Sequence, residues 1–362
     1  MKNLKCWMAL VGFFCTVAMA QNDVVRLGQI VPLSGPLANV GKEINAVTKA
    51  AIEQHNASGK PKIELLTEDD ANNPDKSAAA VVTLQGKTSG LVSCFGTVGC
   101  MAQMKAAQAS GFPLIGPIAG AASLRSKQMP HVFAIRASAK EELQRLLQFA
   151  QGTGLTQFAI AVQDDGFGQA YFADLKAIAA DFGVQLTAIS MLNPQTPNYA
   201  ALVSELNQPK IQALLLLANA SHSVGILKAW REKTTLPFVM NLAGQANGLF
   251  ANGLKGYAGA AAFVTATPSP WEKKLALQRD YQAAMGEAKI TNLSYLGFEA
   301  YINPRVAIEA IKRSKDRMPA SIRLALERNQ FALGGMDLGF GDRSSKRFTD
   351  MALLKADGTF KH

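Results

Sequence analysis

The stretch VVRLGQIVPLSGP, residues 24–36, decides the fold class of this 362-residue chain. Its first part, residues 24–31, is a nearly continuous apolar run, typical of a strand buried on both faces of a parallel sheet. Residues 32–36 contain two prolines and a glycine and break the strand. Residues 41–57 then carry apolar side chains at helical spacing. The order strand, turn, helix indicates an α/β fold.

Strands and helices alternate in the same way along the rest of the chain, and the pattern restarts near residue 141. In the first half we expect strands at 62–66, 91–95 and 113–115, and helices from Asn73-Pro74 onward and at 100–110. In the second half we expect strands at 158–162, 184–189 and 213–217, and helices at 141–150, 169–181, 199–206 and 224–233. The last third adds helices at 273–285 and 295–314 and a strand at 348–354. This alternation predicts two doubly wound parallel-sheet lobes.

Residues 1–20 have the features of a cleavable export signal. Lys2 and Lys5 precede an apolar run at 7–17, and Ala18-Met19-Ala20 is a small-residue cleavage site. We therefore expect cleavage after Ala20 and an exported mature protein.

The charge of the chain does not indicate a nucleic-acid partner. The formal net charge is +10, and it falls to +8 when cleavage removes Lys2 and Lys5. The basic residues are scattered and form no block of the kind that binds nucleic acid. Because 48% of the residues are hydrophobic and only 18% are charged, we expect a globular protein that binds no nucleic acid.

Sequence motifs for catalysis are scarce. The chain has no phosphate-binding P-loop, no nucleophile elbow and no H-E-x-x-H zinc motif, and its four histidines lie far apart. We therefore expect no metal, no cofactor and no enzymatic activity. A hydrolase that uses Cys100 or His222 is the less favoured alternative.

Cys94 and Cys100 are the only cysteines of the expected mature chain. We place Cys94 in a buried strand and Cys100 at the start of the next helix. A disulfide requires that the two Cα atoms lie within about 7 Å. We favour two free thiols at this separation and keep the disulfide as the alternative.

Several short motifs follow the predicted strands. They are Pro32-Leu33-Ser34-Gly35, Asp69-Asp70 with Asn73-Pro74, Gly96-Thr97-Val98-Gly99-Cys100, Gly116-Pro117-Ile118-Ala119-Gly120-Ala121, Arg136-Ala137-Ser138, Gln163-Asp164-Asp165-Gly166-Phe167-Gly168, Pro268-Ser269-Pro270-Trp271, Gly297-Phe298-Glu299-Ala300, Gly334-Gly335 and Asp357-Gly358. In this order and spacing, the mature chain resembles the type I periplasmic binding proteins. Within them it resembles the Leu/Ile/Val-binding-protein-like substrate-binding components of ABC transporters, over nearly all of residues 24–362.

The resemblance implies two α/β lobes joined by three hinge crossings, with a small ligand held in the cleft between them. It assigns residues 24–138 and 268–337 to lobe 1 and residues 139–267 and 338–362 to lobe 2, with crossings near 138, 267 and 338. It also implies a monomer in the periplasm that delivers its ligand to ABC permease subunits in the inner membrane. A ligand-sensing module for a membrane receptor is the alternative.

The candidate ligand-binding residues of the first lobe are small and lie in turns after strands: Ser34, Gly99, Cys100, Ala119, Gly120 and Ala121. Glycine lets backbone N–H groups approach a ligand closely, and the helix start near Cys100 offers unpaired N–H groups that suit a carboxylate. The resemblance implies that amino-acid binders hold the ligand carboxylate with hydroxyl residues at the Cys100 and Gly120 positions. Both hydroxyls are absent here, which weakens the anion site.

The candidates of the second lobe are Glu141, Phe167, Asn219, His222, Asn241 and Gln245. The resemblance implies a Tyr at the Phe167 position and an acidic residue near Glu141 that meets an α-ammonium group, a place that Glu142 fits equally well. We expect Asn241→Ala to weaken ligand binding by about 1–3 kcal/mol if its amide faces the ligand. The ligand class stays open between an amino acid, a small carboxylate, an amide and an aromatic acid.

Overall fold

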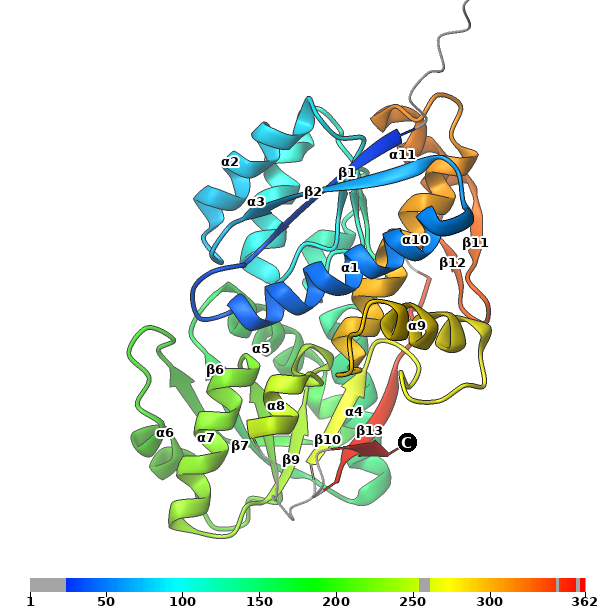
Figure 1. The fold of residues 1–362 in the computed structure, drawn as a ribbon. Coiled ribbons are helices and arrows are strands. Elements are labelled where there is room, and N and C mark those ends of the chain that lie inside the picture. The colour runs from blue at the N-terminus through cyan, green and yellow to red at the C-terminus, as the bar shows by residue number, and fades with distance from the viewer. Residues whose placement is uncertain (1–23, 254–260, 343–344, 356–358, 362) are drawn as a thin grey trace, which may run out of the picture.

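Two large, mainly parallel sheets, each covered by helices on both faces, make up most of the protein (Figure 1). The structure is a computed structural model that describes residues 24–253, 261–342, 345–355 and 359–361. The expected export signal, residues 1–20, lies outside the described residues. We call the first sheet with its helices the first lobe, and the second sheet with its helices the second lobe.

The first sheet is entirely parallel. Its strands, in spatial order, are β2 (Lys62–Asp69), β1 (Val24–Val31), β3 (Leu91–Val92), β4 (Leu114–Ile115) and β5 (Val132–Phe133). Side chains of β1 alternate between the two faces, since Leu27 and Val31 pack in one core and Ile30 in the other. From Leu27 to Val31 the strand is thus buried on both sides, as its sequence predicts, whereas Val24 and Arg26 at its start are exposed.

Helices cover both faces of this sheet. One face carries α1 (Ala38–Ser58), α9 (Ala276–Glu287) and α10 (Tyr295–Arg313), and the other carries α2 (Pro74–Gln85) and α3 (Thr97–Gln108). Asn73 starts α2 as predicted, because its side chain accepts hydrogen bonds from the Asp75 and Lys76 N–H groups and Pro74 occupies the first helical position. The helix α11 (Pro319–Arg328) and the hairpin β11 (Gln330–Ala332) and β12 (Asp337–Gly339) complete this lobe.

The second sheet repeats the strand order of the first and adds two strands at one edge. Its spatial order is β7 (Gln185–Leu192), β6 (Gln157–Gln163), β8 (Ala213–Leu217), β9 (Phe238–Asn241), β10 (Ala261–Thr265), β13 (Asp350–Leu354) and β14 (Phe360–Lys361). The last two strands pair antiparallel to their neighbours, and the others are parallel. All five residues of β8 are buried, as expected for the central strand of a doubly wound sheet.

The helices α4 (Ala139–Thr153) and α5 (Gly166–Ile178) pack on one face of the second sheet. The helices α6 (Tyr199–Leu206), α7 (Ala220–Lys233) and α8 (Gly248–Gly253) lie against the other. Trp230 of α7 and Tyr171 of α5 are among the largest fully buried side chains, one on each face.

The chain passes three times between the lobes, after β5, after β10 and after β12 (Figure 1). Leu338 and Phe340 still pack in the core of the first lobe, so the last passage follows Phe340. The helix α10 touches both lobes, because Tyr295 packs in the second core and Phe298 in the first. The expected fold class, two doubly wound α/β lobes joined by three crossings, is confirmed.

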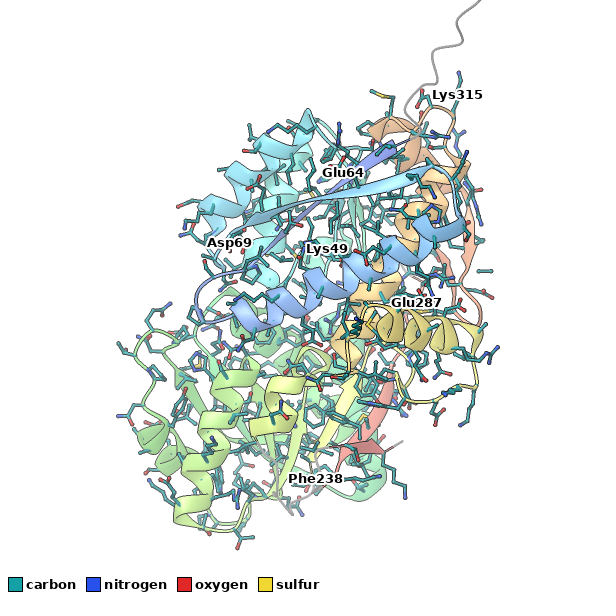
Figure 2. The ribbon with its side chains drawn as sticks, in the orientation of Figure 1. Lys49, Glu64, Asp69, Phe238, Glu287 and Lys315 are labelled. Atoms are coloured by element: carbon teal, nitrogen blue, oxygen red, sulfur yellow. A yellow bond between two sulfur atoms is a disulfide. The ribbon has the colours of Figure 1, made fainter. Side chains whose placement is uncertain are left out.

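Charged side chains of both signs are spread over the outer surface. Lys49, Glu64 and Glu287 are exposed on separate elements of the first lobe, and Lys315 is exposed in the loop after α10 (Figure 2). Within the described ranges, none of the helices combines the length and the apolar character that crossing a membrane requires.

Candidate functional site

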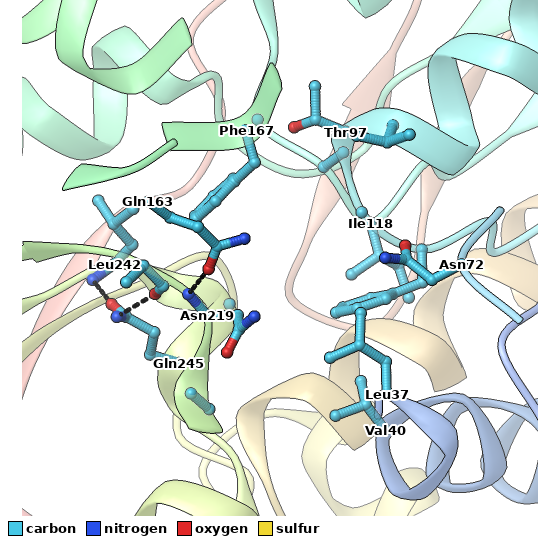
Figure 3. Close-up of a pocket in the computed structure, with 18 of the residues that line it drawn as sticks. Leu37, Val40, Asn72, Thr97, Ile118, Gln163, Phe167, Asn219, Leu242 and Gln245 are labelled. Carbon is cyan, nitrogen blue, oxygen red and sulfur yellow. Dashed lines mark hydrogen bonds between the residues drawn. The ribbon is translucent and has the colours of Figure 1, made fainter. Parts of the chain in front are cut away.

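A cleft lies between the lobes at the carboxyl ends of the parallel strands. It holds about 850 Å3 of empty space, part of it open to solvent. Its lining comes from the segments that follow β1 to β5 in the first lobe and β6, β8 and β9 in the second. Open α/β sheets bind ligands at this edge, where the strand order reverses. In this protein two such edges face each other (Figure 3).

The wall of the first lobe is mainly apolar. Leu37 and Val40 come from the start of α1, and Phe95 and Ile118 from the segments after β3 and β4. Asn72 adds an amide beside them (Figure 3).

The segment from Phe95 to Val98 is closed at its base by a disulfide between Cys94 and Cys100, whose Cα atoms lie 5.4 Å apart. Our expectation of two free thiols is therefore wrong. It placed the helix start at Cys100, whereas α3 begins at Thr97. Gly96, with a φ of 74°, turns the chain so that the first helical turn brings Cys100 back over Cys94. With its sulfur in the disulfide, Cys100 has no thiol, and this corrects the alternative of a hydrolase that uses it.

The N-terminus of α3 opens into the cleft. Gly96 precedes the helix and provides no side-chain cap, so the N–H groups of the first turn have no side-chain partner there. The Thr97 hydroxyl is buried and has no hydrogen-bond partner among the described residues. Figure 3 shows this hydroxyl on the side that faces Phe167. Together these groups form a set of hydrogen-bond donors with partial positive charge.

The wall of the second lobe combines aromatic and amide side chains. The Phe167 ring lies 5.0 Å from the Tyr171 ring, one helical turn further along α5. Gln163 accepts a hydrogen bond from the Asn219 N–H, and Gln245 donates to the Ala218 carbonyl. These bonds fix the amides of the segments after β6, β8 and β9 relative to one another (Figure 3).

Gly120 sits where the first wall touches Tyr171. A Cβ atom at residue 120 would collide with the Tyr171 hydroxyl and come within 3.0 Å of the Ala139 nitrogen. The Gly120 carbonyl accepts a hydrogen bond from that same nitrogen, at 2.7 Å. The turn therefore needs glycine because of a close approach between lobes.

Arg136 joins the lobes through ion pairs at the base of the cleft. Its guanidinium lies 2.5 Å from Glu142 of α4 and 3.4 Å from Glu299 of α10. Burial raises the pKa of Glu299 to about 7, although the Arg136 charge opposes this shift. Glu142 and Glu299 raise the pKa of the Arg136 guanidinium above its ordinary value, against the effect of burial. The cluster thus holds one firmly charged cation and a carboxyl that titrates near neutrality.

The structure brings five of the twelve candidate residues to the cleft wall, and the other seven do not line the cleft. The five are Ala119, Gly120, Phe167, Asn219 and Gln245. The seven are Ser34, Gly99, Cys100, Ala121, Glu141, His222 and Asn241.

Other contacts occupy the polar side chains among these seven. Glu141 caps α4 through Ser138 and accepts a hydrogen bond from the Arg347 N–H. His222 bonds the Tyr199 hydroxyl at 2.8 Å. Asn241 is fully buried in β9 and donates to the Ala262 carbonyl, so we now expect Asn241→Ala to affect folding stability and not affinity.

Several lining residues were not among our candidates. Thr97, Gln163 and Arg136 stand inside motifs that we quoted, so the sequence contained a signal for them. Tyr171 follows Phe167 at the i, i+4 spacing of one helix face, which was the available signal. Asn72 had no such signal, because only the path of the loop after β2 brings it to the cleft.

Comparison with known proteins agrees with this architecture. The family model of the periplasmic binding proteins matches residues 24–361. The chain belongs to the periplasmic binding protein family. This is a family of substrate-binding proteins and not of enzymes. Among the described residues of this binding protein, no group of His, Cys, Asp and Glu side chains is arranged to hold a metal ion.

Individual relatives are distant. The Leu/Ile/Val-binding protein homolog 7 of Brucella abortus is 22% identical, with 92% of this chain and 90% of that protein covered. A substrate-binding periplasmic protein from Ralstonia solanacearum superimposes with a TM-score of 0.85 at 22% identity, covering 93% of this chain and 99% of the other. A solute-binding protein from R. palustris, solved in complex with 4-hydroxybenzoate, gives a TM-score of 0.78 at 17% identity, covering 93% and 95%. At these identities the solved structures show a shared fold.

Proposed function

We propose that this protein captures a small ligand in the cleft between its lobes and delivers it to the permease subunits of an ABC transporter. One observation carries the proposal: the carboxyl ends of two doubly wound sheets face each other across one cleft, and both lobes line it. A ligand in this position contacts both lobes at once. It therefore favours the conformation in which they are closed.

The proposal includes the hinge. The crossings near residues 138 and 267 and the crossing after Phe340 are the segments about which the two lobes rotate, so that Leu338 and Phe340 move with lobe 1. Arg136 supports the assignment of the first crossing as a hinge, because it lies beside that crossing and pairs with carboxylates of both lobes.

The ligand belongs to one of four classes: an amino acid, a small carboxylate, an amide or an aromatic acid. The aromatic and apolar wall supports the larger members of these classes. The structural likeness to a protein solved with 4-hydroxybenzoate supports an aromatic acid.

We further propose that the protein acts as a monomer in the periplasm after cleavage at Ala20. The features of residues 1–20 support export. The intact mass of the protein in a periplasmic extract tests the cleavage site. A mature chain that begins at any residue other than Gln21 contradicts cleavage after Ala20.

A thermal-shift screen of the mature protein against the four ligand classes tests binding. A ligand present at about 100 times its Kd stabilises the folded state by about 2.7 kcal/mol, which raises the melting temperature measurably. Phe167→Ala should then reduce the affinity for the ligand found. Phe348→Ala is the matched control, because Phe348 is partly exposed and does not line the cleft. A folded protein that binds nothing in the screen would contradict the proposal.

A further inference from the structure

A second cavity lies beside two of the three crossings between the lobes. It holds about 840 Å3 of empty space, part of it open to solvent, and none of its described lining residues also lines the cleft. Ser138 lines it from the first crossing, and residues 345–347 line it from the crossing after Phe340. Val132 and Phe340 add apolar surface from the first lobe. Rotation of the lobes about these crossings therefore changes the shape of this cavity.

The charged side chains that line the second cavity are three cations and one carboxylate. The cations are Arg125, Lys346 and Arg347, and the carboxylate is Glu141. The Glu141 carboxylate accepts hydrogen bonds from the Arg347 N–H and from the N–H and hydroxyl of Ser138. With Glu141 ionised, the described lining still carries two more positive charges than negative ones. This balance favours an anion.

Arg125 is a cation that neutral groups hold in place. Its two terminal nitrogens donate to four backbone carbonyls, and its buried Nε has no hydrogen-bond partner among the described residues. No described carboxylate forms an ion pair with it, whereas the neighbouring Arg136 pairs with two. Burial lowers the pKa of Arg125 to about 10 and the charge of Arg136 adds to this shift, although Glu141 and Glu142 oppose it. An anion nearby stabilises a cation in such surroundings.

Lys346 and Ser345 offer hydrogen-bond donors that a bound anion can reach. Both residues are exposed and lie on the crossing after Phe340. In the described part of the chain, the Lys346 ammonium forms no ion pair and the Ser345 hydroxyl has no hydrogen-bond partner. An anion can therefore bind to these two groups without displacing another contact.

We infer that the second cavity is a binding site for a small divalent anion, such as phosphate, sulfate or a dicarboxylate. Lys346 and Ser345 donate to the anion, and Arg125 and Arg347 add positive potential around it. Because the anion draws the crossing after Phe340 toward Arg125 of the first lobe, it favours one angle between the lobes. The inference goes beyond the proposed function, since this site lies outside the cleft.

Isothermal titration calorimetry of the mature protein tests the site with three probes, inorganic phosphate, sulfate and succinate. Sodium chloride keeps the ionic strength constant, so that general screening is the same in every titration. We expect saturable binding of at least one probe with a stoichiometry of one, and weaker binding of acetate, which carries a single charge. The absence of saturable binding at millimolar concentrations overturns the inference. The order of affinities distinguishes an inorganic oxyanion from an organic one.

Two substitutions at the cavity should change the affinity in opposite directions. Lys346→Gln removes a positive charge and should weaken anion binding by about fivefold. Glu141→Gln retains the capping box of α4, removes the negative charge and should tighten binding. Lys49→Gln is the matched control, because Lys49 is exposed on α1 and does not line the cavity. A probe that binds Lys346→Gln and the control equally well occupies another site, such as the cleft, and contradicts the inference.

The effect on the angle between the lobes has a test of its own. The Kd of a cleft ligand found in the thermal-shift screen should differ between saturating anion and chloride at the same ionic strength. The cleft ligand should change the affinity for the anion by the same factor. An equal Kd in both solutions overturns the effect on the hinge. The anion titrations need no cleft ligand, so they decide the site even if the proposed function fails.

Discussion

Arg136 is a buried cation that forms ion pairs with carboxylates of both lobes. It is 3% exposed and lies between a carboxylate from each lobe. Removing one partner of a buried ion pair leaves an uncompensated charge, which typically costs about 3–5 kcal/mol. Glu142 gains a further bond from the Ala243 N–H, at 3.1 Å, whereas Oε1 of Glu299 has no partner among the described residues. Burial with one unpartnered oxygen is what sets Glu299 apart in this cluster and raises its pKa.

The raised pKa of Glu299 predicts a pH dependence of folding stability. The value rises from 4.5 to about 7 on folding, so the folded state favours the protonated form. Glu299 therefore contributes up to about 3 kcal/mol to the free energy of unfolding. This contribution is complete below pH 4.5 and is lost as the pH rises through 7. Urea unfolding between pH 5 and 8 measures this slope, which Glu299→Gln should flatten and Glu287→Gln, at an exposed position, should not. A slope that survives in Glu299→Gln assigns the effect to other groups.

At the scale of elements, the segment between β3 and α3 decides the shape of the first cleft wall. The disulfide Cys94–Cys100 ties its two ends, and Phe95, Gly96, Thr97 and Val98 between them all line the cleft. The bond is buried, since both cysteines are fully inaccessible to solvent. It therefore constrains the residues that we expect to meet the ligand.

Replacing both cysteines by alanine should affect stability and binding together. Loss of a native disulfide typically costs about 2–4 kcal/mol, which denaturant unfolding measures. The ligand affinity should fall as well, because the N–H groups at the start of α3 are no longer held in place. Thiol labelling of the denatured mature chain without reductant provides the direct check. Labelled Cys94 or Cys100 in that experiment would contradict the disulfide.

The sequence predicts a strand or helix best where its apolar residues follow a single regular pattern. The apolar runs at 24–31 and 213–217 coincide with β1 and β8, because a strand buried on both faces needs apolar residues throughout. The start of α3 was placed three residues late, since Gly96 and the small residues after it look like a loop. That shift hid the disulfide. The cleft residues in post-strand turns were accessible to sequence reasoning, whereas the pairing of Arg136 with Glu299 depends on how α10 returns to the first lobe.

At the scale of the whole molecule, ligand binding should change the shape of the protein. The two lobes are joined by three passages of the chain, and the cleft opens between them. A ligand that contacts both walls favours the closed arrangement. Small-angle X-ray scattering should therefore record a smaller radius of gyration with saturating ligand than with a compound of similar size that does not bind. An unchanged radius would show that capture involves no closure.

The close approach of Gly120 to Tyr171 also constrains how this protein could change over generations. A serine or threonine at residue 120 would have to occupy space that the Tyr171 hydroxyl fills. Such a mutation requires the Tyr171 side chain to move or to become smaller. The two positions, which lie 51 residues apart in the sequence, are therefore coupled, because the space at residue 120 depends on the side chain at residue 171. A serine at residue 120 with Tyr171 unchanged should shift the contact between the lobes.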